Sequence, residues 1–210
     1  RFVMGYLLKA NILGILSRFA EAVTCYHDVH FFSKDIRIYQ GLVNCYMSIP
    51  QMKDALSAAQ MACKLHPQHF KSAVLLGSVY NQKGDTRDQA RQEYERAIEI
   101  CQKESEPGRR IAMEECLVGL VDVEMRNNNL AKAIILVKDR LEEFNSDALY
   151  MKLGELYMKA GDHTEAMHNY QIALGLNPKN DLARRGLEEI ELLMQPDEVD
   201  DDGIPDEDVG

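Results

Sequence analysis

The most regular pattern in the chain lies at residues 150–178, YMKLGELYMKAGDHTEAMHNYQIALGLNP. Its first half places large apolar residues or glycine at Tyr150, Leu153, Gly154 and Tyr157. This spacing of i, i+3, i+4 and i+7 puts the four residues on one face of a helix. The first half of the stretch therefore predicts an amphipathic helix.

The second half predicts another helix that packs back on the first. Gly161 and Asp162 interrupt the first helical pattern, and Pro178 cannot continue the second. Between them lie three apolar residues with helical spacing: Ala166, Tyr170 and Ala173. Because Gly154 and Ala166 are small, the two backbones can approach closely while the tyrosines fill the space beside them. The stretch therefore predicts a helical hairpin.

These positions match the tetratricopeptide repeat (TPR), a hairpin of about 34 residues, with Tyr150 in place of its leading Trp. The same spacing recurs upstream, which predicts an all-α, right-handed α-solenoid of about five hairpins. We expect the repeats to lie at residues 3–36, 36–69, 70–104, 112–145 and 147–180. In the fourth, Gly119 and Ala131 keep the signature separation, but Asp122 and Ile135 replace the aromatic residues.

Three segments lie outside the regular repeats. KESEPGRR, residues 103–110, contains a Pro-Gly pair and predicts an exposed loop. Residues 181–194 mix leucines with charged residues at helical spacing, which predicts a helix that caps the open end of the stack. Residues 195–210 hold eight acids, no base and no aromatic residue, so we expect a disordered acidic tail.

The charge balance argues against nucleic-acid binding. The chain has 34 acids and 24 bases, and setting aside the eight acids of the tail leaves 26 acids against those 24 bases. A general nucleic-acid binder needs a basic surface to displace phosphate counterions. No apolar run approaches the roughly 20 residues that span a bilayer, so we expect no membrane segment.

No set of residues predicts catalysis. The nearest metal-like group is Cys25, His27 and His30, whose spacing is weak evidence for a site. The five cysteines form an odd count without a C-x-x-C pair, which favours free thiols in a reducing compartment. We therefore expect no catalytic residue, no metal and no cofactor.

The predicted function lies in the concave groove that the first helices of stacked TPR hairpins form. We expect six residues to line the groove and bind a partner: Arg37, Gln40, Asn44, Lys71, Ser78 and Asn81. The same reasoning places further residues there: Ser48, Glu155, Met158 and Lys159. The alternative is that all of them are solvated polar residues without a ligand. A clamp for acidic chaperone tails is not expected, because Gln40 and Leu75 stand where such clamps carry Lys and Asn.

Two stretches, YQGLVNCYMSIPQMKDAL at 39–56 and residues 153–187, resemble the TPR subunits of the anaphase-promoting complex. The order of degenerate repeats, a near-consensus last repeat, a charged helix and an acidic tail also agrees. This resemblance implies a non-catalytic scaffold subunit of a ubiquitin ligase that acts in mitosis, in the nucleus and cytoplasm. Its implied partners are other TPR subunits of the complex.

The resemblance also implies that homodimerisation would need N-terminal repeats that this chain lacks. Because the chain begins with Arg1 and enters directly into patterned sequence, we expect a fragment of a longer protein or a processed one. The alternative function is a targeting or regulatory TPR module of another complex, such as the protein-binding arm of a glycosyltransferase or phosphatase.

Overall fold

A computed structural model describes residues 2–103, 108–143 and 145–194 of the chain. Within these ranges the backbone forms eleven α-helices and a short 3-10 turn, and no strand. The elements are α1 (Phe2–Ile15), α2 (Phe19–His30), α3 (Ile36–Ser48), α4 (Met52–Leu65), α5 (Phe70–Tyr80), η1 (Gly84–Thr86), α6 (Arg87–Cys101), α7 (Gly108–Arg126), α8 (Leu130–Leu141), α9 (Asp147–Ala160), α10 (His163–Leu176) and α11 (Asp181–Met194). The expected all-α solenoid is confirmed.

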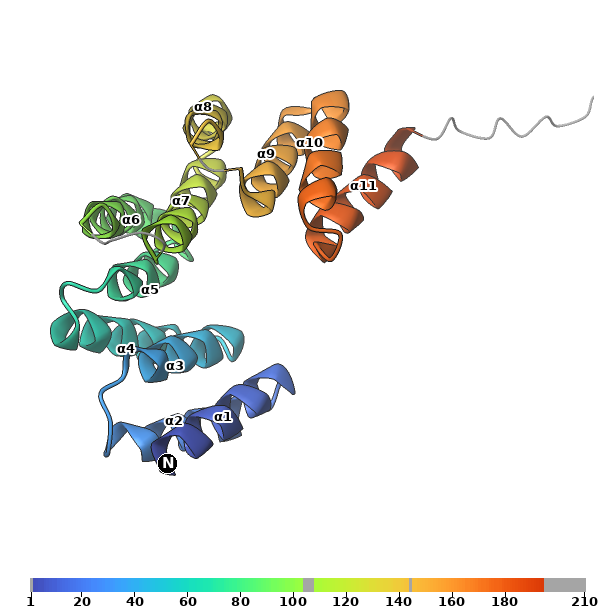
Figure 1. Cartoon of the computed structure of the whole chain (residues 1–210). Coiled ribbons are helices and arrows are strands. Elements are labelled where there is room, and N and C mark those ends of the chain that lie inside the picture. The colour runs from blue at the N-terminus through green and yellow to red at the C-terminus, as the bar shows by residue number, and fades with distance from the viewer. Residues whose placement is uncertain (1, 104–107, 144, 195–210) are drawn as a thin grey trace, which may run out of the picture.

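The helices follow one another as a stack of hairpins. Each odd-numbered helix from α1 to α9 packs on the even-numbered helix after it, and each hairpin packs on the next. Figure 1 shows the resulting curved array, which runs from the blue α1 to the red α11. None of the described helices is long and apolar enough to cross a membrane.

The hairpin of α9 and α10 follows from local sequence. Ser146 caps the start of α9, where its hydroxyl accepts a hydrogen bond from the amide of Leu149. The helix ends at Gly161, which adopts a left-handed φ of 80° that glycine tolerates without strain. Asp162 then caps α10 by accepting from the amide of Glu165 at 3.1 Å. These residues set the turn between the two helices.

The TPR signature residues divide by burial. Leu153, Gly154, Ala166, Tyr170 and Ala173 are buried, whereas Tyr150 and Tyr157 are half-buried and Pro178 is exposed between α10 and α11. The ring of Tyr170 lies between two glycines, and a Cβ atom would fall 2.6 Å from the ring at Gly154 and 2.5 Å from it at Gly186 of α11. The signature glycine therefore provides the space that the tyrosine fills.

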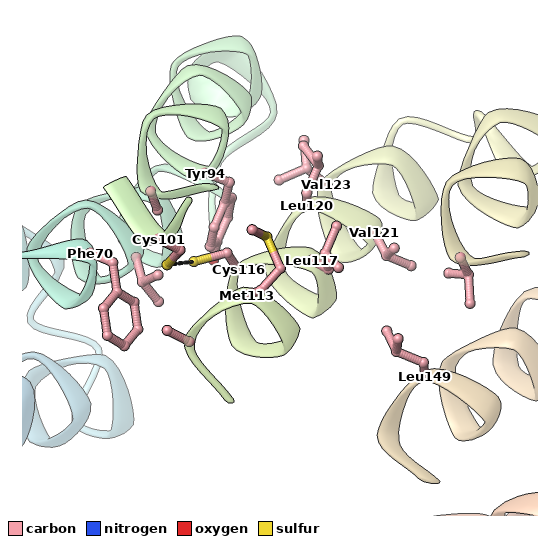
Figure 2. Packing of buried hydrophobic residues seen from close by; sticks show 14 of the residues in the cluster. Phe70, Tyr94, Cys101, Met113, Cys116, Leu117, Leu120, Val121, Val123 and Leu149 are labelled. Carbon is pink, nitrogen blue, oxygen red and sulfur yellow. Dashed lines mark hydrogen bonds between the residues drawn. The ribbon is translucent and has the colours of Figure 1, made fainter. Parts of the chain in front are cut away.

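Apolar contacts continue from one hairpin to the next. The central cluster runs from Phe70 of α5 through Tyr94 of α6 and Leu117 of α7 to Leu149 of α9. Figure 2 shows these side chains pointing into the spaces between the helices. Because no hairpin encloses its own core, the array is stable only as a stack.

The structure corrects two expectations around the fourth hairpin. Helix α7 begins at Gly108, so the last three residues of the predicted loop at 103–110 are helical, while residues 104–107 lie outside the described residues. In α8, Ala133 and Val137 are buried, whereas Ala131 and Ile135 are exposed.

The shift in α8 comes from the turn before it. Helix α7 continues seven residues past Gly119 and a three-residue turn follows, whereas α9 continues six residues past Gly154 before a two-residue turn. Asn128 makes the longer turn possible by adopting a φ of 59°, which Asn tolerates better than most residues. The apolar face of α8 therefore begins two residues later than the signature predicts.

Candidate protein-binding groove

A groove with a cavity volume of about 560 Å³ lies between α1 and α3. Four of the residues predicted to line a groove border it: Arg37, Gln40, Asn44 and Ser48, all from α3. From α1 it is lined by Asn11, Gly14 and Ile15, and from α2 by Phe19 and Tyr26. The structure therefore brings these four predicted residues together in one groove.

Helical periodicity explains why α3 presents this polar stripe. The buried positions of α3 include Ile38, Leu42, Val43, Cys45 and Tyr46, which face the neighbouring helices. The four groove residues recur at i, i+3, i+7 and i+11, which is a stripe along the remaining face. These four side chains do not enter the core and border the groove instead.

Tyr26, Asn11 and Gly41 also line the groove and lie outside the predicted set. Tyr26 donates its hydroxyl proton to Oδ1 of Asn11 at 2.5 Å, and its ring lies so close to Gly41 that a Cβ atom there would overlap it. Burial raises the pKa of Tyr26 to about 12, so the hydroxyl keeps its proton and remains a donor. Asn11 could have been predicted to line the groove from its position in the sequence. It lies 33 residues before Asn44, which is the matching position in the preceding repeat.

Arg37 forms an ion pair with Asp35 at the edge of the groove. Its Nε donates to Oδ1 of Asp35 at 2.9 Å, and its Nη2 donates to Oδ2 at 2.6 Å. The hydrogen bonds from Arg37 lower the pKa of Asp35 and outweigh the opposing effect of burial. Asp35 also caps α3 by accepting from the amide of Arg37, so this ion pair lies at the start of α3.

The other three predicted residues lie elsewhere. Lys71 of α5 pairs with Glu115 of α7, with Nζ 2.5 Å from Oε2. The hydroxyl of Ser78 donates to the carbonyl of Leu75 on its own helix. Asn81 is buried just after α5, where its carbonyl accepts from Arg126. None of the three borders the cavity between α1 and α3.

A second hollow of about 300 Å³ lies toward the other end of the array. The residues predicted in the fifth repeat border it: Glu155, Met158 and Lys159 of α9. Glu155 accepts from Nζ of Lys152 at 2.7 Å, and Lys152 also pairs with Asp122 of α7 at 2.9 Å. Of the ten predicted residues, four thus border the first hollow and three border the second, whereas Lys71, Ser78 and Asn81 border neither.

The three residues considered as a metal site, Cys25, His27 and His30, make other contacts. Nε2 of His27 lies 2.8 Å from the Tyr46 hydroxyl, and Nδ1 of His30 lies 3.1 Å from the Tyr39 hydroxyl. Cys25 is buried as a free thiol. Among the residues that the structure describes, no group of His, Cys, Asp and Glu is arranged to hold a metal ion.

The comparisons with known proteins agree with this architecture. A tetratricopeptide repeat family model matches residues 70–104 and 148–180. The crystal structure of TTC0263, a TPR protein of Thermus thermophilus, has a TM-score of 0.68 at 18% identity and covers 90% of this chain and 99% of that one. The crystal structure of the APC/C hetero-tetramer Cut9-Hcn1 has a TM-score of 0.66 at 16% identity, covering 88% and 35%. Both likenesses concern the fold.

The sequence relatives are more specific. Anaphase-promoting complex subunit 7 of Arabidopsis thaliana is 29% identical over 204 residues, which cover 96% of this chain and 35% of that protein. The chain spans about a third of the length of the curated relatives it matches under this name. The matches to these relatives and to the TPR family model agree with the expectation of a non-catalytic chain. The chain is a TPR solenoid that resembles the TPR region of anaphase-promoting complex subunit 7.

Proposed function

We propose that the chain is a non-catalytic TPR scaffold of the anaphase-promoting complex, the ubiquitin ligase of mitotic cell-cycle control, in the nucleus and cytoplasm. Its partners are other TPR subunits of that complex. The observation that carries the proposal is the similarity to subunit 7 over 96% of the chain. A stack of hairpins suits this role because it offers long surfaces for neighbouring subunits without any need for catalytic residues.

The groove between α1 and α3 supports a role in association. Arg37 and Asn44 are exposed and Gln40 is half-buried, and all three border the same cavity. Exposed side chains of this kind contribute little to folding, and substitutions of them change stability by no more than about 0.5 kcal/mol. An Arg or a paired amide buried at an interface contributes far more to binding, about 2 kcal/mol or more at the best positions.

The test is affinity purification of the tagged full-length protein from dividing cells, followed by mass spectrometry. We expect other TPR subunits of the anaphase-promoting complex to be recovered with it. The triple variant Arg37→Ala, Gln40→Ala, Asn44→Ala should reduce their recovery while circular dichroism and melting stay close to those of the unmodified protein. Lys71 is left unchanged because it does not border this cavity.

A matched control places three substitutions on exposed positions of the outer helix α6: Gln92→Ala, Glu95→Ala and Glu99→Ala. These should leave recovery unchanged. If the unmodified protein recovers no subunit of the complex, the proposed function is wrong. If the groove variant recovers as much as the control, the contact lies on another surface of the array.

A further inference from the structure

We propose that Cys101 and Cys116 form a reversible oxidation site, at which a small-molecule disulfide converts the two thiols into an intrachain disulfide that joins α6 to α7. The inference goes beyond the proposed function and does not depend on it, because it concerns the chain itself and no partner. It rests on the distance between the two sulfur atoms, on their burial in the core and on their position at the joint between two hairpins.

The two sulfur atoms lie in contact across this joint. Cys101 is the last residue of α6 and Cys116 lies in the third turn of α7, and their Sγ atoms are 3.7 Å apart. Figure 2 shows the two side chains pointing toward each other from the two helices. The sulfur atoms of a disulfide lie about 2.05 Å apart, so the two atoms must approach by about 1.7 Å. Rotation about the two Cα–Cβ bonds moves sulfur atoms over distances of this size.

The surroundings of this pair differ from those of the other cysteines. Cys101 and Cys116 are fully buried in the central cluster, where the two thiols are in hydrogen-bonding contact with each other. Cys63 instead donates to a backbone carbonyl oxygen at 3.2 Å. Cys25 and Cys45 are buried in the apolar cluster of the N-terminal helices. The structure therefore favours one pairing among the five cysteines.

Burial controls when the pair reacts. The thiolate is the form of cysteine that attacks a disulfide, and burial raises the pKa of Cys116, so the packed array holds this group as a thiol. Access begins at the start of α7, where Gly108, Arg110 and Ile111 are exposed. Because helix ends open more readily than the core, opening of the first turns of α7 exposes Cys116 without unfolding of the whole array. The reaction is therefore slow, and the pair stays reduced until the surroundings become oxidising.

The oxidation consists of two thiol–disulfide exchanges with glutathione disulfide. The thiolate of one cysteine attacks a sulfur of the oxidant, which forms a mixed disulfide and releases one glutathione. The other cysteine then attacks the protein sulfur of the mixed disulfide, which forms the bond between Cys101 and Cys116 and releases the second glutathione. The two electrons and the two thiol protons pass to the two glutathione molecules, so the protein is oxidised and the reagent is reduced. The bridge then fixes how the third hairpin packs on the fourth.

The test treats the purified full-length protein with glutathione disulfide, removes the reagent, and unfolds the chain in N-ethylmaleimide to block every remaining thiol. After digestion with trypsin without reductant, we expect mass spectrometry to find residues 97–103 joined to residues 111–126, two hydrogen atoms lighter than the separate peptides. The oxidised protein should melt about 5 °C or more above the reduced protein, because the bridge closes a loop of about fifteen residues in the unfolded chain. Dithiothreitol should restore the original melting temperature.

Three single substitutions provide the controls. Cys101→Ala and Cys116→Ala should each abolish the joined peptides and the rise in melting temperature. Either of these variants is sufficient if the other fails to fold. Cys45→Ala is the matched control, because Cys45 is also buried but lies on α3, and this variant should form the bridge as the unmodified protein does.

The inference is overturned if both thiols remain open to N-ethylmaleimide, or if glutathione is found only as a mixed disulfide, as on the partly exposed Cys63. It is also overturned if the bridge forms only in urea that unfolds the array, because the folded arrangement would then play no part in the pairing. A bridge that fails to raise the melting temperature overturns it as well, because the folded helices would then not accommodate the bond.

Discussion

Tyr170 shows how a single side chain joins three helices of the array. Its ring projects from α10 and lies against Gly154 of α9 and Gly186 of α11. Tyr94 of α6 packs in the same way between Gly77 of α5 and Gly119 of α7. Burial raises the pKa of both tyrosines, so they remain neutral at any physiological pH. The aromatic residue of one hairpin thus determines how closely the next hairpin approaches.

Substitutions of two glycines test this packing. Gly154→Ala should destabilise the protein by about 1–3 kcal/mol, because the new Cβ atom would lie 2.6 Å from the Tyr170 ring. Gly175→Ala, in the neighbouring helix and with open space at the Cβ, should stabilise by up to about 1 kcal/mol through helix propensity. Urea unfolding of both variants measures the difference. Equal stabilities would contradict the packing described for Tyr170.

At the scale of elements, a buried carboxylate joins α6, α7 and α8. Glu124 of α7 is 1% exposed and accepts hydrogen bonds from Arg91 of α6 at 2.8 Å, Lys132 of α8 at 2.7 Å and Asn129 at 2.9 Å. Burial alone would raise the pKa of Glu124, but the bonds from Lys132, Asn129 and Arg91 outweigh it and lower the pKa. The network adds polar contacts to α8, in which Ala133 and Val137 are buried and four other apolar residues pack half-buried on the core: Leu130, Ile134, Leu136 and Leu141.

Removal of this carboxylate should be costly. Glu124→Ala removes the shared acceptor of Arg91, Lys132 and Asn129. Because Arg91 keeps its pair with Asp88 and the Lys132 side chain is 61% exposed, we expect a loss of about 1–3 kcal/mol in the free energy of unfolding. Asp88→Ala is the control, because Asp88 pairs with the same Arg91 but its side chain is 85% exposed. The control should change stability by less than about 1 kcal/mol. Thermal and urea unfolding compare the two, and similar losses would show that the buried network does not hold α8.

The network also predicts a pH dependence. A carboxylate whose pKa is lowered by folding stabilises the folded state fully above its unfolded pKa, about 4.3 for Glu. That contribution is lost as the pH falls through the lower folded pKa. The stability difference between the unmodified protein and Glu124→Gln should therefore shrink when urea unfolding is repeated from pH 7 down to below pH 4. A difference that grows on acidification would contradict the lowered pKa.

At the scale of the whole molecule, α11 closes the end of the array. Ala183, Gly186 and Ile190 form its buried face, and Ile190 is fully buried in a cluster with Met151 and Tyr170. Its other face carries exposed apolar residues, among them Leu182, Leu192 and Leu193. Since each hairpin of a solenoid contacts only its neighbours, the last hairpin depends on this helix for its outer packing.

Two truncations test that dependence. A chain that ends at Asn180 loses α11, and we expect it to lose about 3 kcal/mol or more because Tyr170 and the residues around it become exposed. Hydrogen exchange should increase first in α9 and α10 and least in α3 to α5.

A chain that ends at Met194 lacks only the acidic segment, whose sequence has too few apolar residues to pack, and should melt within a degree or two of the full chain. A larger drop in that variant would mean that the segment docks on the array.

Helical periodicity is enough to predict the hairpins and the polar stripe of α3. The signature at residues 150–178 and the stripe of Arg37, Gln40, Asn44 and Ser48 both depend on a period of 3.6 residues, and a periodic pattern assigns each residue to a face of its own helix. Those assignments need no knowledge of neighbouring hairpins.

Which faces of neighbouring helices contact one another follows from the packing between hairpins. The approach of Tyr26 to Gly41, the pairing of Lys71 with Glu115 and the shifted face of α8 depend on the angle and separation between helices. Packing between hairpins sets the angle and separation of the helices. A turn that is one residue longer, or a glycine in place of a larger residue, changes this angle and separation but leaves the helical periodicity of the sequence unchanged. For this reason the sequence indicated the residues on one wall of the groove, while its floor and its extent came from the packing of α1, α2 and α3.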